Sequence, residues 1–394
     1  MNNYLQFYGQ NQISPVSQNI DDMDLHIGRR IGLYRTLGLA ASLFKGRDIL
    51  EVAPGSGHNS IVTATFNPRS YDLVEPNPTG FKKMVSLFDC YPHLNSDTIR
   101  FFNVRLEDFT EDTTYDIVIC EGLIAGLSDH DEFLVKLASK VRKGGILIVT
   151  CADAVSLFFE TLRRYLAKIM VNKLVGVPKD RSGNQKTVLI LLSAFQSHLN
   201  TLEGMSRPFE DWIWDNLVNP ATMAAAASAE FSIEKCLSFL GDDFYFYGSS
   251  PVFMSNWSWY KDLPIKPRDY NEAFANAFDS QRHNLLHYKE IKSIYNASST
   301  LYHHCKAFSL ELEQRTPQEW EKITYETIRK DLEHVLRVLE ITRRCGLHKS
   351  EEAIKEFLAL FIDGKIPNTL TIAEMKSFRT AFGRGQQYLS LIKA

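Results

Sequence analysis

The stretch from Asp48 to Ile61 constrains the fold of this chain more than any other. A short apolar run, residues 49–52, ends at the turn 53–57, which contains two glycines, and a helix-forming segment begins near His58. This order predicts a strand, a tight turn and a helix. The glycines let a ligand approach the backbone closely, and the first N–H groups of a helix lack an intrahelical partner, so the turn suits a nucleotide-like cofactor. Similar turns also occur in chains that bind nothing there.

Four further apolar runs follow the turn. They cover residues 71–74, 99–103, 115–120 and 146–151 and alternate with helical segments, which predicts right-handed crossovers and a parallel sheet of the α/β class. The first of these runs ends in Glu75, about 20 residues after the turn, where a doubly wound fold places a carboxylate that accepts hydrogen bonds from ribose hydroxyls. The sequence therefore predicts an α/β domain with a ribose-binding acid.

These motifs, with the Gly144-Gly145 turn before the last run, resemble those of the class I S-adenosylmethionine-dependent methyltransferases. The resemblance covers roughly residues 45–155 and is weaker near residues 231–250. It implies a seven-stranded Rossmann-like sheet that binds S-adenosyl-L-methionine. A dinucleotide oxidoreductase would explain the first two motifs but gives no reason for the Gly-Gly turn. The residues that the resemblance assigns to the cofactor are Glu51, Ala53, Gly55, Gly57, Glu75, Asn77, Leu106, Glu107 and Cys120.

Two positions depart from the pattern of that family. Ala53 stands where the first glycine of the turn is usual, which narrows the room there. Arg105 stands where an acid usually bonds the adenine amino group. Glu107 or Asp108 is then the candidate for the adenine contact, and this is the least determined of the cofactor contacts.

Three polar residues lie where the resemblance places the acceptor. Glu121 follows the run 115–120, Asp153 follows the run 146–151, and His58 follows the turn. Because ligands of open α/β sheets bind outside the carboxyl ends of the strands, we predict these three as catalytic candidates. Glu121 would bind or deprotonate the acceptor. The alternatives are a Glu121 carboxylate held by backbone N–H groups at Gly122, a His58 that caps a helix or lies in solvent, and an Asp153 that caps the next helix.

The domain organisation expected from the sequence has three parts. Residues 1–45 form an N-terminal helical cap, 46–262 the methyltransferase domain, and 263–394 an all-helical C-terminal domain. In the cap, residues 21–24 begin a helix that ends at Gly38, and members of the family often close such a segment over the cofactor. Candidates for that contact are Tyr8, His26 and Arg30.

A helical insertion of about 80 residues, near 152–230, interrupts the methyltransferase domain. Its acidic and aromatic stretch contains Asp211, Trp212 and Asp215, which we predict to bind a polyhydroxylated acceptor by hydrogen bonds and ring stacking. Buried tryptophans with solvated acids are the alternative. Residues 231–239 and 244–247 are predicted as the last, antiparallel strands of the sheet. Beyond them the pattern is helical over 270–294, 297–314, 317–345, 350–362 and 372–392.

Composition excludes several classes of function. The net charge of −3 gives no overall electrostatic attraction to nucleic acid, and the run after 115–120 lacks the Asn/Asp-Pro-Pro-aromatic motif of enzymes that methylate nucleic-acid amino groups. No apolar run is long enough to span a membrane, and the first residues lack an apolar signal core. The six cysteines form no Cys-x-x-Cys pair. We therefore expect reduced thiols, no metal site and a cytoplasmic location.

The expected function is methyl transfer from S-adenosylmethionine to a small polar acceptor. Residues 248–251 and 257–261 resemble stretches of bacterial methyltransferases associated with surface-sugar biosynthesis, which suggests a sugar, nucleotide sugar or glycan. The C-terminal helices are a candidate surface for a homo-oligomer. Two alternatives stay open: a non-catalytic cofactor-binding or scaffold protein with this fold, and aminopropyl transfer from a decarboxylated cofactor.

Overall fold

The computed structural model describes residues 3–94, 97–174, 176, 180–255, 257–263, 266–291, 298–362 and 366–394. The chain forms two compact units, each assembled from separate stretches of sequence. The first unit comprises Met1–Cys151, Phe231–Phe278 and Gln386–Ala394, and the second comprises Ala152–Glu230 and Asp279–Gly385. The domain boundaries expected near residues 45 and 262 stay predictions.

The first unit contains a seven-stranded sheet, as the sequence predicts. Its strands are arranged in the order β3-β2-β1-β4-β5-β7-β6. The first five strands are parallel, and β7 is antiparallel to both of its neighbours, so the sheet is mixed. The strands are β1 (Asp48–Val52), β2 (Ser70–Val74), β3 (Ile99–Phe102), β4 (Tyr115–Cys120), β5 (Val141–Cys151), β6 (Phe244–Ser250) and β7 (Gln387–Lys393).

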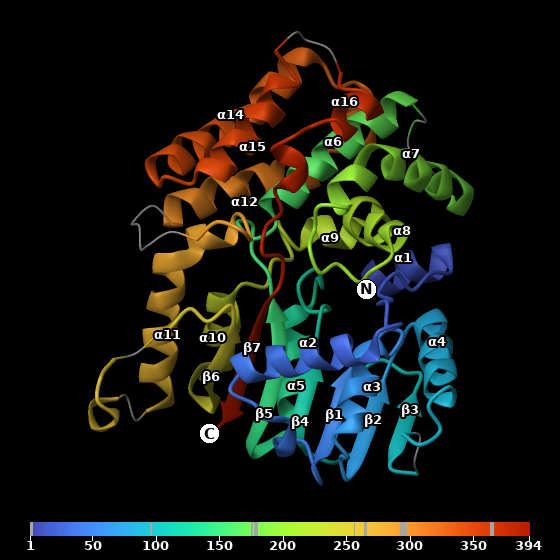
Figure 1. The fold of residues 1–394 in the computed structure, drawn as a ribbon, viewed down its shortest axis with the longest axis vertical. Helices are drawn as coiled ribbons and strands as arrows, with labels where there is room; N and C mark the ends of the chain where they lie inside the picture. Colours follow the sequence, from blue (N-terminus) through green and yellow to red (C-terminus); the bar gives the residue numbers. More distant parts are fainter. Residues whose placement is uncertain are drawn as a thin grey trace. The chain divides into compact units, whose positions relative to one another are not determined.

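The strand predicted over 244–247 is confirmed as β6, whereas the origin of β7 corrects the prediction made from the sequence. Residues 231–239 do not form a strand, because Ile233, Cys236 and Leu240 have helical spacing and are buried in α10 (Ile233–Leu240). The strand β7 comes instead from the end of the chain, where a helix over 372–392 is expected, so the C-terminal region is not all helical. Figure 1 shows β7, in red, lying between β5 and β6.

Helices surround the sheet within the first unit. Asp22 accepts a hydrogen bond from the N–H of Leu25 and caps α2, which confirms the helix start predicted near residues 21–24. α2 packs against α3, α3 against α4, and α10 against β6. The core contains Tyr34, Phe44, Ile49 and Leu73, all fully buried or nearly so. The helices are α1 (Asn3–Asn11), α2 (Met23–Thr36), α3 (His58–Thr65), α4 (Pro78–Asp89), α5 (His130–Ser139), α10, and α11 (Pro267–Gln281) as far as Phe278.

The described residues of the second unit form helices, turns and loops. The helical pattern predicted for 297–314, 317–345 and 350–362 is confirmed in outline, whereas the helix predicted over 270–294 ends at Gln281 and its residues 292–294 lie outside the described part. The elements are α6 (Phe158–Leu174), α7 (Arg181–Leu199), α8 (Phe209–Ile213), a π-helical turn (Trp214–Val218), α9 (Pro220–Ala224), α12 (Ser298–Gln314), α13 (Pro317–Glu321), α14 (Tyr325–Arg344), α15 (His348–Ala359) and α16 (Thr369–Ala373). In the described part of the chain, no helix combines the length and the apolar character that crossing a bilayer requires.

Candidate functional site

The turn after β1 has a backbone that favours glycine. Ala53, Gly55 and Gly57 have φ values of 58°, 62° and 78°, in the left-handed region. Glycine adopts this region without steric cost, whereas a residue with a Cβ is strained there. Gly57 is the N-cap of α3 and supplies no side-chain hydrogen bond. The first N–H groups of α3 are therefore left without a capping side chain, as the sequence predicts for a ligand-binding turn.

Glu75 ties this turn to the end of β2. Its Oε2 accepts a hydrogen bond of 2.7 Å from the N–H of Gly55, and its Oε1 accepts one of 2.7 Å from the N–H of Asn77. The side chain is buried, and burial raises the pKa of Glu75 to about 7, although the two backbone hydrogen bonds oppose that shift. The carboxylate predicted to bind ribose thus lies directly beside the glycine turn.

Glu51 lies at the same end of the sheet, one strand away. The hydroxyl of Tyr71, on β2, donates a hydrogen bond to its Oε2. Burial raises the pKa of Glu51 to about 7, and the hydrogen bond from Tyr71 opposes the shift. Tyr71 was not among the candidates from the sequence, because only the pairing of β1 with β2 brings it to Glu51.

Glu121, after β4, is paired with Arg30 of α2. The guanidinium donates to both carboxylate oxygens, at 2.7 and 2.9 Å, and also to the hydroxyl of Tyr34 at 2.8 Å. The side chains of Arg30 and Glu121 are only 8% and 10% exposed. Burial alone would lower the pKa of Arg30, but the charge of Glu121 raises it well above its usual value. The partner of Glu121 is therefore a guanidinium and not the backbone at Gly122, whose N–H donates to Thr150.

His58 is the first residue of α3. Its Nδ1 lies 3.1 Å from the Ser56 hydroxyl, and its carbonyl oxygen lies 2.9 Å from Nε2 of His26. Burial lowers the pKa of the His58 imidazole to about 4. The ring is accordingly neutral at pH 7, and its catalytic role stays a prediction.

The remaining cofactor candidates differ in exposure. Asn77 caps α4 by accepting from the N–H of Thr79 at 3.1 Å, and its side-chain amide donates to the carbonyl of Ile13 at 3.0 Å. Leu106 and Cys120 are buried, and burial raises the pKa of the Cys120 thiol. Glu107 is exposed. Their contacts with a cofactor stay predictions.

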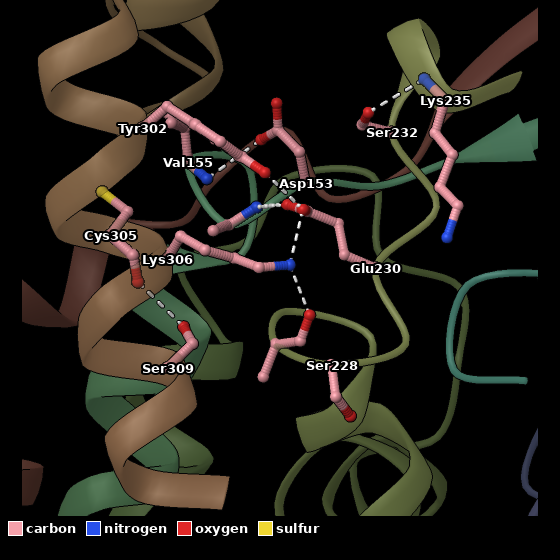
Figure 2. A network of polar contacts seen from close by, with 12 residues as sticks. Asp153, Val155, Ser228, Glu230, Ser232, Lys235, Tyr302, Cys305, Lys306 and Ser309 are labelled. Carbon is pink, nitrogen blue, oxygen red and sulfur yellow. Dashed lines mark hydrogen bonds and ion pairs between the residues drawn. The ribbon is translucent and has the colours of Figure 1, made fainter. Parts of the chain in front are cut away.

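Asp153 belongs to the second unit and lies in a buried polar network (Figure 2). Its Oδ1 accepts from the N–H groups of Val155 and Ser156, both at 2.9 Å, and its Oδ2 accepts from Nε of Arg282 at 2.9 Å. In the same network, Oε2 of Glu230 accepts from Tyr302 and Lys306, each at 2.6 Å. Asp153 thus holds the turn that precedes α6 and pairs with Arg282, and both its catalytic role and the capping alternative stay predictions.

The acceptor candidates of the insertion also lie in the second unit. Trp212 is buried and its ring contacts Phe382 edge-on, with centroids 6.3 Å apart. Asp215 accepts from Arg207 at 3.0 Å, and Asp211 is half-buried. Trp212 thus packs as an anchor, which was the alternative to a stacking surface. Binding of an acceptor by these three residues stays a prediction.

The described residues contain no group of three or more His, Cys, Asp or Glu side chains that could hold a metal ion. The polar groups described for the candidate site are carboxylates, backbone N–H groups, one paired guanidinium, the Tyr71 hydroxyl, the Asn77 amide and the His58 imidazole. Such groups bind and orient a ligand that carries hydroxyl and amino groups.

The strand order 3-2-1-4-5-7-6, with a glycine turn after β1, is typical of the class I methyltransferase fold. The first unit has this fold. No family model matches the chain.

The chain is similar to curated ubiquinone biosynthesis O-methyltransferases. It is 26% identical over 144 residues to that of Rickettsia prowazekii (strain Madrid E), covering 36% of this chain and 52% of that protein. It is 23% identical over 137 residues to that of Rickettsia bellii (strain OSU 85-389), covering 34% and 52%. The chain thus spans about half the length of the curated relatives it matches.

Solved methyltransferase structures are also similar to part of the chain. The N-methyltransferase NodS from Bradyrhizobium japonicum WM9 is 14% identical, with a TM-score of 0.30, over 39% of this chain and 74% of that one. The magnesium protoporphyrin IX methyltransferase from Synechocystis PCC 6803 is 16% identical, with a TM-score of 0.27, over 38% and 69%.

The polar groups of the first unit can be compared with the groups of S-adenosylmethionine that they would have to bind. Glu75 is an acid that can accept from ribose hydroxyls, and the uncapped start of α3 offers N–H groups for a carboxylate. These groups fit the cofactor. The cofactor would have to lie close to the backbone of Gly55. Part of that space is already filled, because a Cβ added at Gly55 would overlap Cγ2 of Val16. The polar groups therefore fit, while Val16 fills one face of the turn.

Proposed function

We propose that this chain is an S-adenosylmethionine-dependent methyltransferase that acts on a small polar acceptor. The observation that carries the proposal is the left-handed glycine turn whose Gly55 N–H is held by Glu75. Glu75 also ties the turn to the end of β2, but burying a carboxylate without a cation is costly. A ligand that carries hydroxyl groups explains why the acid is kept.

In this proposal the main task of the chain is to bind the cofactor and the acceptor and to orient them for methyl transfer. The bound cofactor supplies an activated methyl group on its sulfonium sulfur. Glu75 accepts from the ribose hydroxyls, the turn at Gly55 and Gly57 admits the amino-acid end, and Glu51 orients that end through the turn. Glu121, paired with Arg30, accepts a hydrogen bond from the acceptor, which places the nucleophile for in-line attack.

The class of acceptor is the finer part of the proposal. A sugar, nucleotide sugar or glycan is the class suggested by the sequence, with Asp211, Trp212 and Asp215 as its contacts. The name of the curated relatives, ubiquinone biosynthesis O-methyltransferase, adds a second candidate, an intermediate of ubiquinone biosynthesis. Both classes offer hydroxyl groups, so both belong in the same screen.

The proposal is tested by calorimetric titration of the chain with S-adenosylmethionine and S-adenosylhomocysteine. We expect saturable binding that Glu75→Ala weakens about 10- to 100-fold, because a hydrogen bond to a charged group is lost. Glu132→Ala, an exposed acid at the start of α5, is the matched control and leaves binding unchanged. Circular dichroism verifies that both variants are folded.

Absence of heat and of any thermal shift with either ligand would overturn the proposal. Binding without methylated product from any acceptor class would favour the non-catalytic cofactor-binding protein. Binding of decarboxylated S-adenosylmethionine in preference to the intact cofactor would favour aminopropyl transfer.

A further inference from the structure

A short segment between α1 and α2, which we name the strap (Ile13–Val16), lies along the proposed cofactor turn. The side-chain amide of Asn77 donates to the carbonyl of Ile13 at 3.0 Å, and Nζ of Lys83 lies 3.4 Å from the carbonyl of Ser14. At Gly80, a Cβ would lie 3.1 Å from the Ser14 hydroxyl. The strap therefore contacts the segment after β2 and the first two turns of α4.

Val16 makes the closest approach to the turn after β1. Its Cγ2 fills the space where a Cβ at Gly55 would stand. Gly55 is left-handed, with φ of 62°, and its N–H is the one that Glu75 accepts. The face of the turn that a glycine leaves open is thus taken by a valine side chain of the same chain.

The strap is held by hydrogen bonds at its backbone, among them one of 3.0 Å from the N–H of Ile13 to the carbonyl of Tyr8, and by burial of Ser14 and Pro15. The side chains of Asn77 and Lys83 donate to backbone carbonyls of the strap, and Lys83 is exposed. The Ser14 hydroxyl is buried and has no hydrogen-bond partner among the described residues. A buried hydroxyl without a partner opposes the position that buries it. The unpartnered hydroxyl therefore lowers the cost of moving the strap away from the turn.

We propose that the strap is a plug that competes with the cofactor for the open face of Gly55. This inference rests on the proposed function, because it assigns that face to S-adenosylmethionine. A ligand that needs a partly populated open state binds with an apparent Kd equal to the intrinsic Kd divided by the fraction of the chain in the open state. The strap would thus set the affinity and the loading rate of the site. A segment that closes over a bound cofactor would have the opposite effect.

The test varies the size of residue 16 and measures binding of S-adenosylhomocysteine by calorimetry and stopped-flow fluorescence. Val16→Ala removes the methyl groups that fill the turn, and we expect roughly fivefold tighter binding and faster association. Val16→Leu enlarges the plug and weakens binding by a similar factor. Val135→Ala, the same truncation at an exposed position of α5, leaves binding unchanged.

Hydrogen exchange gives an independent readout on the native chain. Saturating S-adenosylhomocysteine is expected to speed exchange at the amides of Ile13, Ser14 and Val16, because the strap is displaced. Slower exchange there, or weaker binding by Val16→Ala, would show instead that the strap forms part of the ligand site and would overturn the plug. Equal binding by wild type and all variants would also overturn it while leaving the proposed function intact. Absence of binding by wild type and every variant would remove the proposed function and the plug together.

Discussion

The carboxyl ends of β2 and β4 carry two acids that look alike in the sequence and differ in the fold. Glu75 follows β2 and is held by the backbone N–H groups of Gly55 and Asn77. Glu121 follows β4 and is held by the guanidinium of Arg30. Both side chains are buried or nearly so. The chain has thus placed one acid beside dipoles and the other beside a full positive charge.

The two environments differ in how well they stabilise a negative charge on the acid, and therefore in how each acid responds to a ligand. A buried carboxylate beside dipoles alone is costly to ionise, which is why burial raises the pKa of Glu75 to about 7. A carboxylate beside a buried guanidinium gains a compensating charge, and removal of either partner leaves the other uncompensated. The end of β2 therefore suits reversible binding of hydroxyl groups, and the end of β4 is a fixed, charged support.

The largest effect on the free energy of unfolding is expected from Arg30→Met. It leaves Glu121 buried without its cation, and we expect a loss of about 3–5 kcal/mol in the free energy of unfolding. Urea denaturation of the chain measures this. The double variant Arg30→Met/Glu121→Gln should recover much of the loss, because no buried charge remains.

The matched control for that prediction is Arg69→Met. Arg69 pairs with Asp48, but its side chain is 62% exposed and its charge stays solvated. A far smaller change is expected, since solvent screens exposed pairs. Equal losses of unfolding free energy for the Arg30 and Arg69 variants would show that burial does not increase the contribution of the Arg30–Glu121 pair to stability.

A pH titration extends the comparison to Glu51, a third buried acid at this end of the sheet, which accepts a hydrogen bond from the neutral hydroxyl of Tyr71. Burial raises the pKa of Glu51 to about 7, so its contribution to stability is fully present below its unfolded pKa and is lost as pH rises to about 7. Glu51→Gln should flatten the fall in unfolding free energy between pH 5 and pH 7, and at pH 8 it should be up to ~3 kcal/mol more stable than wild type. Denaturant titrations across this pH range measure the effect.

The control here is Glu132→Gln, which changes an exposed acid of α5. Its pH profile should match that of the wild type. A Glu51→Gln profile parallel to wild type would mean that the ionised carboxylate is already well stabilised, and the contrast with Glu121 would disappear.

The smallest expected effect concerns the strain in the turn. Ala53 has φ of 58°, where a Cβ is disfavoured, so Ala53→Gly should stabilise the chain by about 1 kcal/mol. Ala307→Gly, within α12, should destabilise by a similar amount, because glycine weakens a helix interior. Thermal unfolding of the two variants measures opposite shifts. A destabilised Ala53→Gly would indicate that the alanine methyl makes a contact worth more than the strain.

Much of the first unit could be predicted because its signals are local. The runs that form β1 to β5 are apolar and bounded by turn residues, and the glycines of the turn occupy left-handed positions, as their type suggests. The prediction of a strand at 231–239 was wrong because an apolar stretch of this length suits a strand or a buried helix. The helical spacing of Ile233, Cys236 and Leu240 favours the helix, and in the fold this face is buried in α10, which packs against β6.

The sequence by itself determined the parallel half of the sheet, the glycine turn and the positions of Glu75 and Glu121. The tertiary structure alone decided the origin of β7, because a strand between two others is defined by hydrogen bonds to β5 and β6, which lie far away in the sequence. It also decided the partners of the acids, since Arg30 reaches Glu121 across 91 positions and Val16 reaches Gly55 from another segment. Local patterns specify backbone conformation, whereas the charge and the room around a side chain depend on what the fold brings beside it.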